Sequence, residues 1–128
     1  MSEKTLTKSL KVEEENLAVA MGSGSLMVLA TPAVVALMEN AAAELAQVEL
    51  DNEEFTTVGT MISIEHISPT PIGAQVTATA VLKKVEGRMF YFDVTAKDIM
   101  GEIARGTHTR VSVNAEKFQN KADEKFDA

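Results

Sequence analysis

The chain of 128 residues contains no cysteine, no tryptophan and only two histidines. Without cysteine it forms no disulfide, no thiolate metal site and no cysteine nucleophile, and this composition suits a cytoplasmic protein in a reducing environment. The two histidines are too few for a histidine-rich metal cage and lack ligand spacing with nearby carboxylates, so we expect no metal. Aromatic residues make up only 5%, which argues against a platform for stacking nucleic-acid bases.

Positive charge is also scarce, since 12 lysines and arginines face 19 aspartates and glutamates, for a net charge of −7. An acidic chain repels a phosphate backbone unless its cations are clustered, so we expect no nucleic-acid partner. No glycine-rich loop of the Walker or dinucleotide-binding type is present. The length fits one domain over residues 1–128, long enough to bury a core.

Residues 16–43 contain a single charged side chain, Glu39. This stretch is not a membrane span, because the Gly-Ser run at 22–25 interrupts it and the apolar run 26–38 is shorter than the roughly 20 residues that a bilayer needs. It is not a signal peptide either, since the acidic residues 13–15 precede it where a basic region belongs. The isolated carboxylate of Glu39 therefore calls for an explanation.

The stretch is expected to form a helix over residues 30–48, with Thr31 as the N-cap and Pro32 in the first helical position. Its interior consists of good helix formers, and apolar residues surround it almost completely from 33 to 43. A helix that is apolar all round is usually enclosed by other structure. The remaining pattern predicts a strand at 5–12, a loop at 16–25, strands at 57–67, 76–86, 88–98 and 102–113, and a short charged helix within 115–128 that docks through Phe118 and Phe126.

The period of two in residues 57–67 predicts that Val58, Ile62 and His66 share one face of the strand, with Thr57 and Gly59 on the other. A long apolar helix followed by antiparallel strands predicts an α+β fold in which a curved sheet wraps around the helix, the arrangement known as the hotdog fold. Because a free sheet edge is normally paired or protected, we expect a symmetric dimer.

Three side chains could carry chemistry. Glu39 could act as a general base or orient a nucleophile, or it could face solvent on a polar stripe with Asn40. Thr31 could serve only as an N-cap, or it could help the helix N-terminus to stabilise an oxyanion. His66 could exchange protons near neutral pH, or it could be a polar residue at a strand end. His108 is expected to be structural or interfacial.

Short motifs follow one another along the chain: Ala30-Thr31-Pro32, Leu37-Met38-Glu39, Val58-Gly59-Thr60, His66, Pro69-Thr70-Pro71-Ile72-Gly73, Val85-Glu86-Gly87-Arg88, Gly106-Thr107-His108 and Glu116-Lys117-Phe118. In this order and spacing they resemble the fluoroacetyl-coenzyme A (CoA) thioesterase group of the hotdog thioesterases. The resemblance covers roughly residues 18–118. It implies an active site formed by Thr31, Glu39 and His66.

The resemblance also implies that Gly59 lines the substrate site, and that a thioester carbonyl lies between helix and sheet. Pro32 and Arg110 are our further candidates for residues that bind the substrate. The reaction would be hydrolysis of a small acyl-CoA, with the thioester as substrate and no further cofactor. Either Thr31 or a water held by Glu39 would attack the carbonyl, while His66 exchanges protons. The loop 18–29 contains no aromatic residue, so the resemblance carries over the chemistry and leaves the acyl group open.

Two other functions remain open at this point: an acyl-CoA hydratase or dehydratase of the same fold, and a non-catalytic module for acyl-CoA binding or dimerisation. The expected partners are a small acyl-CoA and further copies of the chain, as a homodimer or a dimer of dimers, without a membrane partner. The basic side chains that could bind the CoA phosphates are Lys83, Lys84, Arg88, Arg105 and Arg110.

Overall fold

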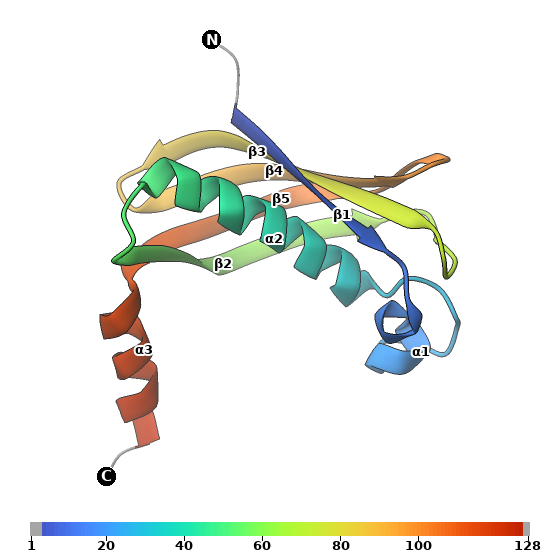
Figure 1. Ribbon diagram of the computed structural model, residues 1–128, viewed down its shortest axis with the longest axis horizontal. Coiled ribbons are helices and arrows are strands. Elements are labelled where there is room, and N and C mark those ends of the chain that lie inside the picture. The colour runs from blue at the N-terminus through green and yellow to red at the C-terminus, as the bar shows by residue number, and fades with distance from the viewer. Residues whose placement is uncertain (1–3, 127–128) are drawn as a thin grey trace.

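The fold consists of one long helix laid across a five-stranded antiparallel sheet, as the computed structural model of residues 4–126 shows (Figure 1). The strands are β1 (Lys4–Lys11), β2 (Phe55–His66), β3 (Gln75–Glu86), β4 (Met89–Asp98) and β5 (Gly101–Asn114). The α-helices are α1 (Ala18–Met21), α2 (Thr31–Leu50) and α3 (Ala115–Asp123), with short 3₁₀ turns at Glu14–Asn16 and Glu124–Phe126. Each of these five strands and both longer helices corresponds to an element predicted from the sequence.

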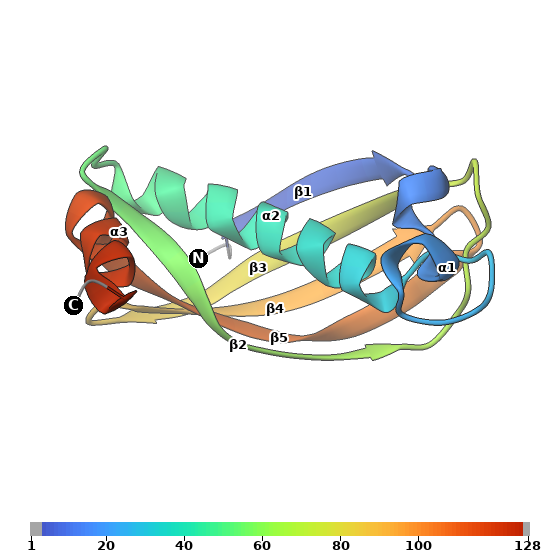
Figure 2. The same cartoon turned by 90° about the horizontal axis from the view of Figure 1, so that it is seen from below.

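The sheet has the order β1-β3-β4-β5-β2, in which β3, β4 and β5 form a meander. β1 pairs with β3 along one edge, and β2 pairs with β5 along the other. Seen from below, the sheet curves under α2, with α1 and its loop at one end of the helix and α3 at the other (Figure 2). β2 is thus an edge strand beside the long helix.

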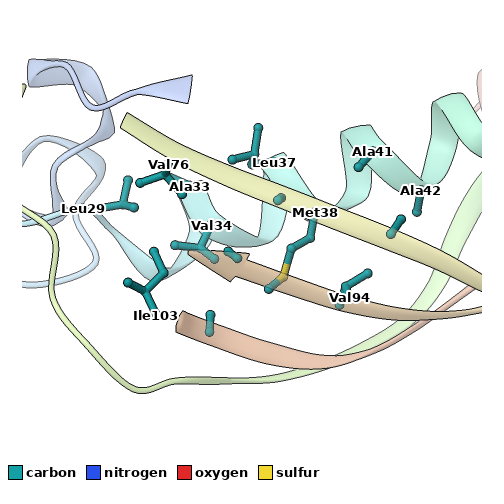
Figure 3. Packing of buried hydrophobic residues seen from close by; sticks show 14 of the residues in the cluster. Leu29, Ala33, Val34, Leu37, Met38, Ala41, Ala42, Val76, Val94 and Ile103 are labelled. Carbon is teal, nitrogen blue, oxygen red and sulfur yellow. The ribbon is translucent and has the colours of Figure 1, made fainter. Parts of the chain in front are cut away.

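Helix α2 is buried on the side that faces the sheet and open on the side that faces away. Its buried residues form a stripe that packs against β3, β4 and β5, with Val34 and Met38 near Val94 and Ile103 (Figure 3). Alanines at many of these positions let the helix lie close to the strands. Every fourth residue, at 32, 36, 40, 44 and 48, is exposed. The prediction of an enclosed helix is therefore wrong for this outer stripe of a single chain.

A β-bulge interrupts β2 at Thr60. The register with β5 runs from Gly59 opposite Arg110 to Met61 opposite Thr109, so one residue of β2 is extra. An extra residue reverses which side chains face the core on its two sides. Thr57 is consequently buried, and Gly59 lies under the helix. His66, an even-numbered residue beyond the bulge, faces the same side of the strand as the odd-numbered Gly59. The prediction that Gly59 and His66 occupy opposite faces of the strand is wrong for this reason.

Candidate active site

Thr31 and His66 form a hydrogen-bonded pair where α2 begins and β2 ends. Thr31 Oγ1 lies 2.8 Å from His66 Nδ1. The residues on either side of the pair are tied together by the backbone, since Leu29 N–H donates to the Thr70 carbonyl at 2.9 Å. Ala30 N–H donates to the Asn16 carbonyl at 2.9 Å, which fixes the point at which the helix starts. The two side chains that sequence spacing left apart are thus held in contact.

Thr31 is the first helical residue and not the N-cap. The N-cap position belongs to Ala30, which has extended backbone angles and no side chain able to cap the helix. The Thr31 hydroxyl is therefore free to contact His66 instead of a backbone N–H. In the first turn of α2, the N–H groups of Ala33 and Val34 donate to the Ala30 carbonyl, and Pro32 has no N–H. The Thr31 N–H is therefore the one donor of this turn without an acceptor within residues 4–126.

The second ring nitrogen of His66 is buried without a partner. No group within the described residues forms a hydrogen bond with Nε2. Burial is the main cause that lowers the pKa of His66 below its ordinary value, and the nearby backbone of Ser68 opposes this only in part. His66 is consequently neutral at pH 7 and can accept a proton. A buried N–H without an acceptor is costly, so this nitrogen points to a missing contact.

Glu39 lies in the middle of α2, beside the bulge of β2. Its carboxylate borders a cavity of about 240 Å³ whose other lining residues are Gly59, Thr60, Met61, Ile62 and His108. A Cβ atom added to Gly59 would lie 2.9 Å from Glu39 Oε2. The absence of a side chain at Gly59 therefore makes room for the carboxylate. The Glu39 side chain is 40% exposed, so it is neither fully buried nor freely solvated.

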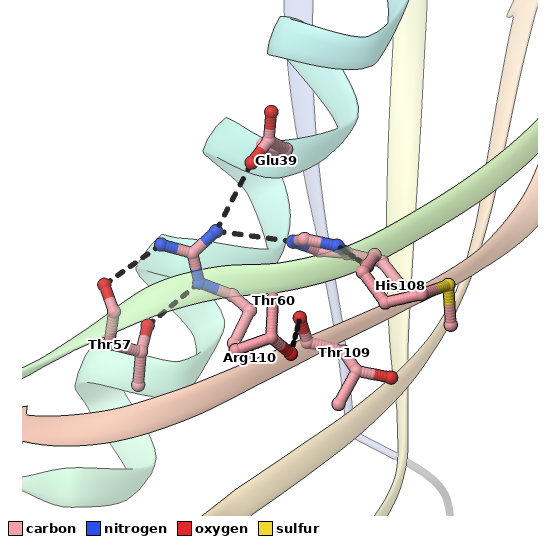
Figure 4. A network of polar contacts seen from close by, with 7 residues as sticks. Glu39, Thr57, Thr60, His108, Thr109 and Arg110 are labelled. Atoms are coloured by element: carbon pink, nitrogen blue, oxygen red, sulfur yellow. Dashed lines mark hydrogen bonds and ion pairs between the residues drawn. The ribbon is translucent and has the colours of Figure 1, made fainter.

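Arg110 holds the carboxylate of Glu39 from beneath (Figure 4). Its side chain is only 9% exposed, and Nη1 lies 3.7 Å from Glu39 Oε2. Nε donates to Thr57 Oγ1 at 2.8 Å and Nη2 donates to the Thr57 carbonyl at 2.9 Å. Two hydrogen bonds to one residue fix the plane of the guanidinium group. Thr57 was not among the residues predicted from the sequence, because the bulge that turns it inward leaves no sequence pattern.

His108 completes this network as a neutral ring. Its Nδ1 lies 2.8 Å from the Met61 carbonyl, and its Nε2 lies 3.1 Å from Arg110 Nη1. A carbonyl can only accept and a guanidinium can only donate, so the proton is on Nδ1 and Nε2 accepts. Burial is the main cause that lowers the pKa of His108, and the charge of Arg110 lowers it further. The structural role predicted for His108 agrees with this position.

Comparison with known proteins identifies the family. A family model for the fluoroacetyl-CoA-specific thioesterase FlK matches residues 12–116. A fluoroacetyl-CoA thioesterase from Streptantibioticus cattleyicolor is 41% identical over 101 residues, which cover 79% of this chain and 72% of that protein. The chain belongs to the fluoroacetyl-CoA-specific thioesterase family.

The solved structures agree with this membership. A crystal structure of the fluoroacetyl-CoA thioesterase FlK superposes with a TM-score of 0.89 at 31% identity, covering 98% of this chain and 96% of that one. A hot-dog-like protein from Thermanaerovibrio acidaminovorans shares the fold, with a TM-score of 0.87 at 24% identity and coverage of 98% and 93%. The predicted hotdog fold is confirmed, and the protein is an acyl-CoA thioesterase of this family.

In this member of the thioesterase family, the three predicted catalytic residues fall into two groups. Thr31 and His66 are in contact, whereas Glu39 contacts Arg110. Eight positions of helix separate Thr31 from Glu39, about 12 Å along the axis. Pro32 is exposed on the outer stripe of α2, one residue beyond Thr31. A single chain therefore brings together a threonine–histidine pair and a separate carboxylate.

The described residues contain no group of three or more histidine, aspartate or glutamate side chains that could hold a metal ion. Likewise, between residues 4 and 126 there is no helix whose length and hydropathy would let it cross a bilayer.

Proposed function

We propose that this protein hydrolyses short acyl-CoA thioesters and that Thr31, Glu39 and His66 form its catalytic set. The observation that carries the proposal is the 2.8 Å contact between Thr31 Oγ1 and a neutral His66 at the start of a helix. A hydroxyl beside an imidazole that can accept its proton is the arrangement of an activated nucleophile. The direction of the hydrogen bond follows, with the Thr31 hydroxyl donating to Nδ1 and the ring proton on Nε2.

The reaction then proceeds through an acyl-threonine. Thr31 Oγ1 attacks the thioester carbonyl carbon, and the hydroxyl proton passes to His66 Nδ1. The C–S bond then breaks, and His66 returns this proton to the departing CoA sulfur. A water molecule next attacks the acyl-Thr31 ester and gives its proton to His66, which passes it to the Thr31 oxygen as that bond breaks. The products are the free acid and CoA. The unoccupied Thr31 N–H and the dipole of α2 stabilise the negative oxygen formed at each attack.

A second copy of the chain supplies the missing carboxylate. His66 Nε2 needs an acceptor that the described residues do not provide, and Glu39 needs to approach a reacting group that its own chain keeps about 12 Å away. β2 is a free edge strand that runs past both groups. Antiparallel pairing of two β2 edges about a two-fold axis at Ser63 would place Thr60 of one protomer, which borders the Glu39 cavity, opposite His66 of the partner subunit.

This pairing is testable because the chain has no cysteine of its own. Ser63 is exposed on β2 at the proposed axis, so two copies of Ser63→Cys would lie opposite each other within disulfide distance. We expect mild oxidation to link Ser63→Cys protomers into covalent dimers. Thr95→Cys, exposed on β4 in the middle of the sheet, is the matched control and should stay uncrosslinked. A monomer by light scattering, or equal crosslinking of both variants, would remove the shared site and leave Glu39 outside the catalytic set.

The acyl group is proposed to be small and aliphatic. The loop before α2 presents Leu26 and Met27, which are 67% and 65% exposed, and it has no aromatic side chain to close over a small polar acyl group. A related FlK has been crystallised with fluoroacetate and CoA, which supports a small acyl group on the same carrier. CoA thioesters are made inside cells, and the cysteine-free chain suits that reducing compartment, so we place the protein in the cytoplasm.

The deciding experiment measures release of free thiol from a panel of acyl-CoA substrates, from acetyl and fluoroacetyl to hexanoyl. We expect hydrolysis of the short aliphatic members, and a loss of roughly 10²-fold or more in kcat for Glu39→Gln and for His66→Ala. Thr31→Ala should lose a similar factor, whereas Thr31→Ser should retain activity because it keeps the hydroxyl. Activity of Thr31→Ala close to that of the parent would replace the acyl-threonine by direct attack of water. Binding of every thioester without cleavage would make the protein a binding module.

A further inference from the structure

Helix α3 carries a groove that the proposed reaction leaves unused. The helix extends from the end of β5 away from the sheet (Figure 1). Phe118, Lys121, Ala122 and Lys125 line a cavity of about 310 Å³ along one face of it. A second cavity, of about 240 Å³, shares Phe118 and Lys121 and adds Arg88, Lys117 and two residues from the end of β5. We call these two adjoining cavities the α3 groove.

The α3 groove concentrates positive charge on an acidic protein. It contains Arg88, Lys117, Lys121 and Lys125, which are four of the 12 basic residues of a chain whose net charge is −7. Among residues 4–126, no carboxylate lines either cavity. None of the four cations has an ion pair within residues 4–126, although the chain has an excess of carboxylates. Unpaired cations gathered in one groove attract an anion, and their number suits more than one phosphate group.

An aromatic surface lies among these charges. Phe118 borders both cavities and remains 43% exposed, so one side of its ring is open to a ligand. Nucleotide bases stack on such rings, and basic side chains beside the ring neutralise the phosphates of the same nucleotide. The chemistry of the α3 groove therefore matches a small nucleotide that carries several phosphates.

The other basic side chains that were candidates for the CoA phosphates are engaged elsewhere. Lys84 pairs with Glu86 and lies over the Tyr91 ring, and Arg105 pairs with Glu102. Lys83 pairs with Asp93, and Arg110 is buried beneath Glu39. Arg88 is the one of the five that lines the α3 groove.

The groove lies within reach of the cavity at Glu39. Asn114, which caps α3, is opposite Phe55 on β2, and Arg110 is opposite Gly59. Four residues of strand therefore separate the reaction cavity from the start of α3, about 13 Å. The pantetheine arm of CoA is about as long as four extended residues, ~14 Å. In the proposed dimer, where Glu39 of one chain meets the reacting pair of the other, a thioester beside Glu39 can thus extend its nucleotide to α3 of the chain that supplies Glu39.

We propose that the α3 groove binds the adenosine 3′,5′-bisphosphate end of the CoA substrate. The adenine stacks on Phe118, and Arg88, Lys117, Lys121 and Lys125 neutralise the phosphates. This inference rests on the proposed function, since it assigns the carrier half of the same substrate. It assigns CoA recognition to α3 and keeps it apart from the residues that act on the acyl group.

The test compares acetyl-CoA with acetyl-pantetheine, which has the same thioester but no nucleotide. In the double variant Lys117→Glu/Lys121→Glu, the ratio of kcat/KM for acetyl-CoA to that for acetyl-pantetheine should fall about tenfold or more, mainly through KM. Phe118→Ala should lower the ratio without a change of charge. The double variant Lys11→Glu/Lys97→Glu has the same charge change at two exposed positions outside the groove and should keep the ratio of the parent.

A binding measurement separates failure of this inference from failure of the proposed function. Calorimetry with the full chain should show binding of adenosine 3′,5′-bisphosphate, weaker binding of inorganic phosphate, and loss of both in Lys117→Glu/Lys121→Glu. Binding of the bisphosphate with no hydrolysis of either thioester would overturn the proposed function and support the groove. Three results would overturn the proposed role of the α3 groove: an unchanged ratio, an equal loss in the control, or dissociation of the oligomer by the α3 variants in light scattering. Dissociation would make α3 a contact between copies of the chain.

Discussion

Gly59→Ala tests whether the position of the Glu39 carboxylate controls the rate. The added Cβ would lie 2.9 Å from Glu39 Oε2 and 3.1 Å from His108 Cε1, whereas ordinary contacts begin at 3.4 Å. The carboxylate must therefore move by about 0.5 Å, because the ring of His108 is fixed on its other side by the Met61 carbonyl. Since a displacement of about 1 Å in an active site can cost about 10²-fold, we expect kcat/KM to fall about tenfold.

The folding of the variant should be nearly unaffected. The backbone of Gly59 has no positive φ, so alanine can adopt it, and the side chain that must move is partly exposed. The free energy of unfolding in urea should stay within about 1 kcal/mol of the parent. Gly24→Ala is the matched control, because its Cβ would meet only Ala18 Cβ at an ordinary 3.4 Å. Thiol release from acetyl-CoA by the purified variants measures the effect.

A second substitution distinguishes displacement of the carboxylate from a general effect of the new methyl group. Glu39→Asp shortens the side chain by one methylene and removes the overlap with the Cβ of Gly59→Ala. In a double-mutant cycle, Gly59→Ala should therefore cost less in the Glu39→Asp background than in the parent. The reasoning is refuted if Gly59→Ala retains kcat/KM within about twofold of the parent, or if the two effects are additive.

Four further outcomes are expected. Burial lowers the pKa of His66 and of His108 in the folded protein, so the unfolded chain binds more protons below about pH 6.5. The free energy of unfolding in urea should therefore fall as the pH drops from about 7.5 to about 5. A rise over this range would contradict these directions. Over the same range kcat/KM should fall with a midpoint below about 6.5, since the proposed reaction needs neutral His66. Arg110→Lys should lower the free energy of unfolding by about 1–3 kcal/mol because lysine cannot make both bonds to Thr57, and an unchanged urea midpoint would rule this out. Gly106→Ala should fail to fold or lose more than about 5 °C in thermal unfolding, because its Cβ would overlap the Ser63 carbonyl and lie 2.7 Å from Ile64 Cα; a melting curve like that of the parent would refute it.

The elements of the fold were predictable because each has a local cause. The helix formers after Pro32 and the alternation in the later strands located α2, β3, β4 and β5 to within a few residues. The start of α2 was misassigned by one position, since Thr31 is a better capping residue than Ala30 in isolation. Contact with His66, a residue distant in sequence, takes the hydroxyl that a local rule would use as a cap.

The site was predictable only in its composition. Nothing near Glu39 in the sequence shows that Arg110 and Thr57 lie beneath it, because those contacts depend on the pairing of β2 with β5. The pairing of Thr31 with His66 depends on the turns that tie Leu29 to Thr70. The carboxylate alone in an apolar stretch pointed to Glu39 as a candidate, whereas its contacts with Arg110 depend on non-local geometry that residue spacing does not contain.

The extra residue at Thr60 divides β2 into two segments that alternate independently. Before it, the odd-numbered residues Thr57 and Gly59 face the helix, and after it the even-numbered residues up to His66 do so. One strand can therefore serve a carboxylate pocket and an imidazole at once. Deleting Thr60 would give β2 one continuous alternation of side chains. Either the helix-facing residues before position 60 or those after it would then point away from α2. The extra residue at Thr60 thus lets one short strand present both the pocket for the Glu39 carboxylate and the His66 imidazole to the same helix.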